Sequence, residues 1–397
     1  MNLREIADQI GIGKYPEAMD AVYADMEFTD VPACDLENIE NLEKEFGIYG
    51  KYYDLVMETG KAINADPLRS IWVKVAVEFA RRCTDSIAPR AIPVPAADGT
   101  DVTAFLPVHI IAAQIPASIA EYRRRGFSEE EIQEANRTYR GGISIVENQT
   151  GRPGLNQLYY GWQNHFLKAE IYKAGSIQFE LRTLPNSAVY LRHKETKEVI
   201  ALMNAGTFHA SGMQILGSRG YEDPEGAFKV SFTEDDENFY GFRSYGQKVS
   251  NKTEAFSKNE WYLFAKPGDK CMSIHIPKGA DISPETLDAA FAEGRRILQL
   301  RYPEHTGNMI FASSWILDPT LETILGPNSK ISKLGQRFVR YPQRSPGMHV
   351  FGNVFAKQLE NKPYEDLPED TSLMRGLKQL YLDGGHIYAY AGLIPEF

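Results

Sequence analysis

The sequence predicts an α+β protein, in which a helical N-terminal region precedes a region built on a mixed β-sheet. Apolar residues recur at helical spacing through about the first 170 residues, strand-like alternation begins near Gly175, and a strand–helix–strand pattern follows the alternating segments. The chain has 397 residues, more than one hydrophobic core usually serves. We therefore expect two domains, a helical one over residues 1–153 and a mixed-sheet one over residues 154–397.

Two segments of the first region carry clear helix-start signals. Asp66-Pro67 is a helix-initiating pair, and apolar residues follow along one face of residues 68–79. Ser128 and Glu131 have the spacing of a capping box ahead of a second apolar stripe. We find no catalytic cluster in this half, which favours a substrate-side or docking domain.

Strand signals dominate the middle of the chain. Residues 176–182 alternate as a half-buried strand does, and residues 188–203 have the pattern of a hairpin. Three further strand-like pieces continue an antiparallel meander over residues 227–232, 240–245 and 260–265. The aromatic and acidic residues of 201–257 fit two interpretations, an aromatic-walled cleft and a hairpin extension of the sheet.

Charge and cysteine content limit the classes of partner. A net charge of −10 repels phosphate polymers and anionic lipid, so neither nucleic acid nor a membrane is an expected partner. Three scattered cysteines form no disulfide framework and no zinc motif, and no metal is expected. We predict no signal peptide and no stretch of about 18 apolar residues, so the expected location is cytoplasmic.

The most informative segment covers residues 270–284. Alternation places Ser273 and His275 on one small, polar face of a strand that ends at Pro277. Gly279 permits a turn, and Ser283-Pro284 starts a helix with an apolar stripe. A strand that leads through such a turn into a helix N-terminus suits a pyrophosphate, because free N–H groups and the positive end of the helix dipole meet there.

Four groups of residues resemble one known family. They are similar to the bacterial acyltransferase-domain proteins that pair a helical N-acyltransferase N-terminal domain with a GNAT-like C-terminal domain. The resembling residues are Ile274-His275-Ile276-Pro277-Lys278-Gly279, Ser314-Trp315-Ile316-Leu317-Asp318-Pro319, Asn328-Ser329-Lys330-Ile331 with Gln336-Arg337-Phe338, and Asp370-Thr371-Ser372-Leu373 with Gly384-Gly385-His386.

The resemblance implies a fold and a co-substrate. The strand that ends in His-Ile-Pro is similar to the GNAT strand that splays from its neighbour, here residues 309–315, and receives acetyl-CoA or another acyl-CoA. The following turn takes the place of the pyrophosphate loop. The implied cofactor-binding residues are Ser273, Ile274, Ile276, Lys278, Gly279, Ala280 and Ser283.

The resemblance also implies transfer of an acyl group to an unknown small-molecule or peptide amine by direct attack. His275 is the candidate base or polarising group, Glu180 a candidate carboxylate base, and Ser313 and Ser314 candidate donors to the thioester or the thiolate. Each also has a structural alternative, such as a core histidine or a surface ion pair. Two rival functions stay open, a non-catalytic small-ligand-binding protein on the same fold and a serine hydrolase.

Overall fold

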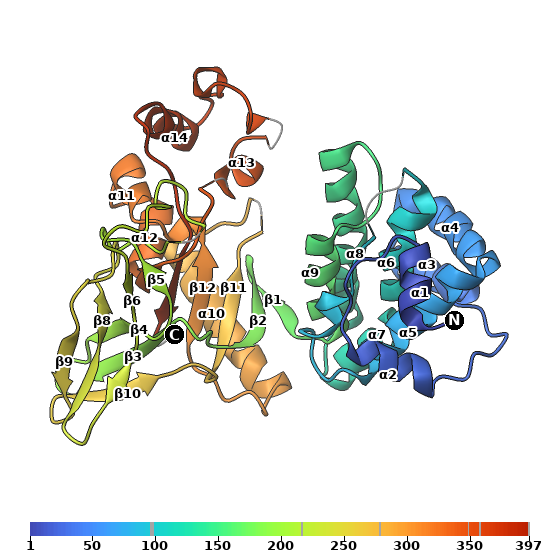
Figure 1. Ribbon diagram of the computed structural model, residues 1–397, viewed down its shortest axis with the longest axis horizontal. Coiled ribbons are helices and arrows are strands. Elements are labelled where there is room, and N and C mark those ends of the chain that lie inside the picture. Colours follow the sequence, from blue (N-terminus) through green and yellow to red (C-terminus); the bar gives the residue numbers. More distant parts are fainter. Residues whose placement is uncertain (96–98, 216, 278, 348, 357–358, 396–397) are drawn as a thin grey trace. The chain divides into compact units, whose positions relative to one another are not determined.

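The computed structural model describes all residues except 96–98, 216, 278, 348, 357–358 and 396–397 (Figure 1). The chain divides into two compact units, Met1–Tyr172 and Lys173–Phe397. The first is helical and the second contains the β-sheets, which confirms the predicted α+β class. The boundary predicted at residues 153/154 stays a prediction.

The first unit is built from helices that pack around one apolar core. Their starts follow the sequence signals: Asp66 accepts hydrogen bonds from the first turn of α5, and Ser128 and Glu131 form a reciprocal capping box on α8. The helices are α1 (Leu3–Gln9), α2 (Ala18–Asp25), α3 (Leu36–Phe46), η1 (Gly50–Tyr52), α4 (Tyr53–Ala65), α5 (Pro67–Arg82), η2 (Pro89–Ala91), α6 (Asp101–Ala112), α7 (Ile115–Arg124), α8 (Glu129–Thr150) and α9 (Gln157–Leu167).

Helices α6 and α7 form the most apolar segment of this unit. By length and composition alone, Asp101–Arg124 is long and apolar enough to cross a membrane. The expectation that no stretch of the chain is apolar enough to span a bilayer therefore does not hold for this segment. The share of its most apolar window that is buried inside the protein is 72%. Packing in a protein core accounts for this composition, because a helix buried on all sides is apolar all round.

A histidine of α6 is buried in this core. His109 is 1% exposed, and its Nε2 lies 3.0 Å from the Thr59 hydroxyl oxygen on α4. Burial lowers the pKa of the His109 imidazole to about 3, because charging the ring inside the core costs free energy. In the unfolded chain the same ring titrates at about 6.5.

This depressed pKa predicts acid sensitivity. Below about pH 6.5 the unfolded chain binds a proton that the folded chain excludes, so stability falls with pH by up to about 1.4 kcal/mol per unit. We expect His109→Leu to remove this slope between pH 6.5 and 5 in urea unfolding followed by far-UV circular dichroism. His209→Gln, on an exposed loop, is the control and should keep it. Equal slopes for all three proteins would contradict the prediction.

The second unit contains two six-stranded sheets and a short ribbon. The first sheet has the order β1-β2-β11-β12-β14-β13, and the second has the order β10-β3-β4-β8-β7 with β9 beside β8. The strands are β1 (Ile171–Ala174), β2 (Ile177–Thr183), β3 (Ala188–His193), β4 (Val199–Met203), β5 (Thr207–Phe208), β6 (Phe228–Lys229), β7 (Thr233–Glu234), β8 (Asn238–Ser244), β9 (Glu254–Ser257), β10 (Trp261–Ala265), β11 (Lys270–His275), β12 (Ile310–Ser314), β13 (Val339–Pro342) and β14 (Tyr390–Ile394).

The two sheets share a hydrophobic core. Tyr190 and Ala201 of the second sheet belong to the same buried cluster as Cys271, Phe311 and Ala391 of the first. The 201–257 stretch contributes β4 to β9 to this arrangement, which favours the hairpin-extension interpretation over a cleft of its own.

The remaining helices of the second unit lie between its later strands. They are α10 (Pro284–Arg301), η3 (Trp315–Leu317), α11 (Thr320–Leu325), α12 (Lys330–Gln336), α13 (His349–Asn353), η5 (Tyr364–Asp366) and α14 (Ser372–Leu382). Gly294 lets α10 approach β2 closely, since a Cβ there would lie 2.6 Å from the Phe179 ring. The antiparallel partners β13 and β14 are separated in sequence by residues 343–389, a helical insertion whose Phe351, Leu377 and Tyr381 form a buried cluster together with Leu321 of α11.

Strands β11 and β12 are parallel neighbours joined through α10, as the crossover pattern predicted. Their described register holds only two residue pairs, Met272 with Ile310 and Ser273 with Phe311. Beyond those pairs β11 continues to His275 and β12 to Ser314. The two strands therefore separate at their C-terminal ends and open the middle of the sheet.

Candidate functional site

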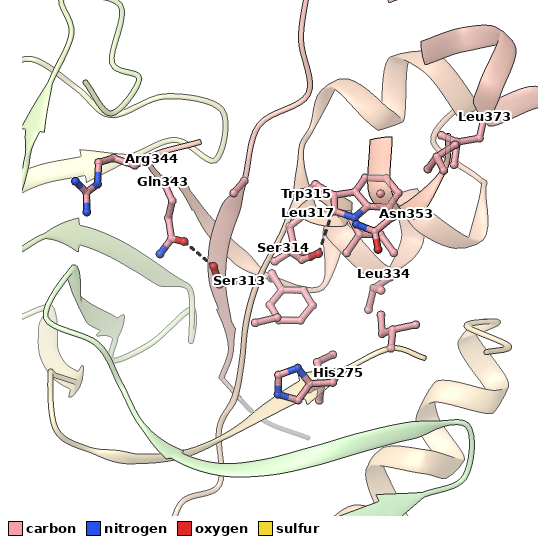
Figure 2. A pocket seen from close by; sticks show the side chains of 18 of the residues that line it. His275, Ser313, Ser314, Trp315, Leu317, Leu334, Gln343, Arg344, Asn353 and Leu373 are labelled. Carbon is pink, nitrogen blue, oxygen red and sulfur yellow. Dashed lines mark hydrogen bonds between the residues drawn. The ribbon is translucent and has the colours of Figure 1, made fainter. Parts of the chain in front are cut away.

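A cavity of about 750 Å³ occupies the gap between the separated strands. Ile274, His275 and Ile276 line it from the β11 side, and Ala312 and Ser313 line it from β12. The remaining walls come from η3, α12 and the 343–389 insertion, with Trp315, Leu334, Gln343, Arg344, Asn353 and Leu373 among the lining residues (Figure 2).

A histidine–carboxylate pair lies at this cavity. The Nε2 atom of His275 is 2.7 Å from Glu180 Oε2 on the neighbouring strand β2. Register pairs Ser273 with Glu180 and His275 with Gln178, so the two side chains are diagonal neighbours on one face of the sheet. The sequence predicted both residues as candidates, and the structure brings them together.

The pair has one buried and one accessible member. The Glu180 side chain is 3% exposed and the His275 side chain 29% exposed, and only His275 lines the cavity. Arg182 approaches Glu180 at 3.6 Å from the next residue on the same face. Because a carboxylate only accepts hydrogen bonds, Nε2 of His275 carries a proton, and Nδ1 is the basic nitrogen of the neutral ring.

Ser313 has its hydroxyl proton engaged. Its Oγ donates to Gln343 Oε1 at 2.6 Å, the contact drawn in Figure 2. Gln343 also lies beside Tyr341: burial raises the pKa of the Tyr341 phenol to about 12, and side-chain hydrogen bonds from Ser187 and Gln343 oppose that shift. The hydrogen bond to Gln343 therefore fixes the direction of the Ser313 hydroxyl.

Ser314 and Asp318 shape the neighbouring wall. Ser314 Oγ accepts the Ile316 N–H at 3.3 Å and so starts η3. Asp318, 2% exposed, accepts the backbone N–H groups of Tyr388 at 2.7 Å and Thr320 at 2.8 Å, while burial raises the pKa of its carboxyl. These bonds fix the turn that carries Trp315 against the start of β14.

The predicted cofactor-binding residues differ in where the structure places them. Ile274, Ile276 and Gly279 line the cavity. Ser273 is 3% exposed and forms the last pair before the strands separate. Lys278 lies outside the described residues. Ala280 donates its N–H to the Pro277 carbonyl, which closes the turn.

The N-terminus of α10 already carries a carboxylate. Asp281 accepts hydrogen bonds from Ser283 N at 3.0 Å, from Ser283 Oγ and from Thr286 Oγ1, both at 2.9 Å. Lys330, the first residue of α12, pairs with Asp281 at 2.8 Å. This ion pair, followed by the hydrogen bonds, holds the pKa of the Asp281 carboxyl well below its usual range. Ser283 precedes α10 as predicted, but its hydroxyl bonds to Asp281 and Thr286 and does not cap the helix itself.

Sequence reasoning missed the cavity residues of the insertion, among them Gln343, Arg344, Asn353 and Leu373. Gln343 and Arg344 directly follow strand β13, and the end of a strand in an open sheet was the one available signal. Nothing in the spacing of Asn353 or Leu373 distinguishes them from ordinary helix residues.

A second serine–histidine–carboxylate group lies in the helical unit. Ser86 Oγ donates to Glu170 Oε2 at 2.5 Å and lies 2.8 Å from His165 Nδ1, while Arg90 meets His165 Nε2 at 3.0 Å. Ser86 is 1% exposed and His165 is 4% exposed. Because the serine proton faces the carboxylate and the other ring nitrogen faces a guanidinium, this group ties the η2 region to the end of α9. It is not arranged as a nucleophile–base pair.

Cys271 belongs to the cavity strand β11 but is buried at 0% exposure. Burial raises the pKa of its thiol to about 12, and burial does the same to Cys34. Among the described residues, no three His, Cys, Asp or Glu side chains come together as metal ligands.

These thiols should be unreactive in the folded protein. We expect a disulfide reagent to modify one thiol per chain, Cys83, whose side chain is partly exposed, with Cys34 and Cys271 reacting only after unfolding. Cys83→Ser should abolish the native reaction, as read by mass spectrometry. Modification of Cys271 in the intact protein would contradict this prediction.

Comparison with solved structures supports the fold. An acyltransferase mutant in complex with octanoyl-CoA matches with a TM-score of 0.66 at 17% identity, over 99% of both chains. An acyltransferase in complex with decanoyl-CoA matches with a TM-score of 0.67 at 16% identity, over 100% of both chains. An acyltransferase in complex with decanoyl-CoA and teicoplanin matches with a TM-score of 0.64 at 18% identity, over 99% of both chains. At these identities the likeness shows the fold.

Among curated proteins none matches the sequence significantly. The family model described as the GNAT-like C-terminal domain matches residues 171–394, more than half of the chain and nearly all of the unit that holds the cavity. The separated parallel strands, the turn into α10 and the cavity between them all fall inside this match. The resemblance found in the sequence is confirmed, and the chain belongs to the family of proteins with a GNAT-like C-terminal domain.

Proposed function

We propose that this protein transfers an acyl group from an acyl-CoA to an amine. The observation that carries the proposal is the cavity between β11 and β12, with the His275–Glu180 pair on its wall. Facing strand edges that no longer pair with each other leave backbone donors and acceptors open to a ligand. The pantetheine arm of coenzyme A carries amide groups and can bind such edges as an added strand does.

The donor is proposed to enter from the side of α10 and α12. The N-terminus of α10 after Gly279 is the proposed pyrophosphate site, where the phosphates would compete with the Asp281 carboxylate, and Lys330 is the nearby cation. Trp315, Leu334 and Leu373 give the cavity apolar wall area. The matched structures hold octanoyl-CoA and decanoyl-CoA, which supports medium-chain donors here beside acetyl-CoA.

His275 is the proposed base and Glu180 its positioning partner. The amine nitrogen attacks the thioester carbonyl carbon while His275 Nδ1 accepts the amine proton, and the Glu180 carboxylate stabilises the resulting imidazolium. A C–N bond forms and the C–S bond breaks. The sulfur leaves as coenzyme A after regaining one proton, so the products are an amide and the free thiol.

Backbone N–H groups on the open edge of β11 would stabilise the developing oxyanion. The Ser314 hydroxyl accepts from Ile316 but keeps its own proton, so it can donate to the departing sulfur. The Ser313 hydroxyl already donates its hydrogen bond to Gln343. That arrangement disfavours the serine-hydrolase alternative, because the Ser313 hydroxyl donates to an amide oxygen, which does not activate a nucleophile.

Kinetics test the roles of the pair. We expect His275→Ala and Glu180→Gln each to lower kcat about a hundredfold or more, because general base catalysis is lost or misaligned. Acyl-CoA affinity should change little. The double variant should be no slower than His275→Ala alone, since both residues act through one proton transfer. His209→Gln is the matched control. Wild-type rates in the His275 variant would refute the assignment.

Calorimetry tests donor binding at the turn. Gly279 has φ +82° with open space around its Cα, and Gly268, at the turn before β11, has φ +89° and equally open space. A valine at either position strains the turn similarly. We expect Gly279→Val to weaken acetyl-CoA, decanoyl-CoA and free coenzyme A binding at least tenfold, and Gly268→Val to leave it unchanged. Equal affinity in both variants would argue against the turn as the phosphate site.

One observation favours the alternative of a non-catalytic ligand-binding protein. The Asp281 carboxylate occupies donors at the N-terminus of α10 that a pyrophosphate would use. If neither acyl-CoA nor free coenzyme A binds the wild-type protein, this alternative replaces the acyltransferase proposal. The variant Asp281→Asn distinguishes the two functions, because it removes the negative charge that pairs with Lys330. It should strengthen coenzyme A binding only if the phosphates occupy this turn.

A further inference from the structure

Arg344 is an exposed residue that lines the cavity, and the described residues supply no acidic partner for its guanidinium. Resting on the acyl transfer proposed above, we propose that the acceptor is an amine that also carries an anionic oxygen group, a carboxylate or a phosphate, and that Arg344 binds this group. A guanidinium offers a fork of N–H donors that matches either anion, so it selects for charge and geometry together.

The backbone around Arg344 is held in place from both sides. Its own N–H donates to Gln214 Oε1 at 2.9 Å, and the next residue, Ser345, donates its N–H to Ser218 Oγ at 3.1 Å. Ser218 and Ser345 are both 0% exposed. These hydrogen bonds fix the backbone that carries the Arg344 side chain, and the residue itself is exposed. Such preorganisation reduces the entropy lost when an anion binds.

Arg344 lies on the side of the cavity away from the expected donor phosphates. Figure 2 shows Arg344 and Gln343 on one side and Leu334 on the other. Leu334 belongs to α12, whose first residue, Lys330, pairs with Asp281 in the turn before α10. The pyrophosphate side is therefore the α12 side, and the guanidinium opposite it is left for the acceptor.

Ser313 lies between these two sides and can orient the amine. Because its proton is donated to Gln343, the Ser313 oxygen offers only lone pairs to the cavity. An incoming amine N–H can donate to it, which directs the nitrogen lone pair elsewhere, toward a carbonyl carbon. The same cavity wall thus combines an acceptor for the amine and a cation for its acidic group.

A matched amine series tests the proposal. The probes are ω-amino acids, ω-aminoalkyl phosphates and simple alkylamines of equal chain length, with decanoyl-CoA as donor. We expect the acidic amines to have kcat/KM at least tenfold above the alkylamines. Arg344→Gln should abolish this preference through acceptor KM, with donor KM unchanged, and Arg344→Lys should restore part of it. Arg296→Gln, which removes a surface cation paired with Glu293 on α10, is the control.

Two results would overturn the inference. Either alkylamines serve as well as acidic amines in the wild type, or Arg344→Gln raises the KM of the donor and leaves that of the acceptor unchanged, which would assign the cation to a coenzyme A phosphate.

If no amine is acylated, the acyl-transfer proposal fails, and binding still decides the role of Arg344. Calorimetry with coenzyme A present should then detect ω-amino acids in the wild type and not in Arg344→Gln. Equal heats in both proteins would refute the role.

Discussion

The separation of two parallel strands after only two residue pairs is the constraint on which the rest of this site depends. A parallel pair normally continues its ladder, since unpaired backbone groups inside a sheet are costly. Here β11 and β12 diverge after Ser273 and Phe311, and the cavity occupies the gap. The cost is acceptable where a ligand can replace the missing strand contacts, which is why an opening in the centre of a sheet indicates binding.

Different interactions fix the side chains on each side of the cavity. The β2 side supplies a buried carboxylate that fixes the tautomer of His275. The β12 side supplies Ser313, whose hydroxyl is oriented by Gln343. The turn that carries Trp315 is secured by backbone hydrogen bonds to the buried Asp318 carboxylate. The polar side chains of the cavity wall are already hydrogen-bonded and the rest of the wall is apolar. A ligand can therefore be oriented with little rearrangement of the protein.

Much of this fold could be predicted from the sequence, because its local signals are strong. The strand ending at His275, the Gly279 turn and the helix after Ser283 appear in the structure where the pattern predicted them. The candidates His275 and Glu180 were also accessible from residue type and alternation. Their pairing was not, because the register between β2 and β11 is set by packing across nearly a hundred residues of chain.

The remaining site residues could not be predicted for a related reason. Gln343 and Arg344 belong to the insertion between β13 and β14, whose backbone is fixed there by tertiary hydrogen bonds from Arg344 to Gln214 and from Ser345 to Ser218. No periodicity encodes such a contact. Asp281 precedes α10 in the sequence, but only the structure shows that Lys330 pairs with its carboxylate.

The insertion also has a consequence for how the second unit folds. Strand β14 lies between β12 and β13, yet residues 343–389 must be closed into a loop before β13 and β14 can pair. Closing a long loop costs chain entropy that is recovered only when contacts at its ends form. The apolar cluster of the insertion also includes Leu321 of α11, so its formation ties the insertion to a preceding helix and shortens the effective loop if it comes before strand pairing. Completion of the sheet and formation of the cavity wall are then a single late event in folding, and sequence changes in the insertion would alter the folding rate and the site together.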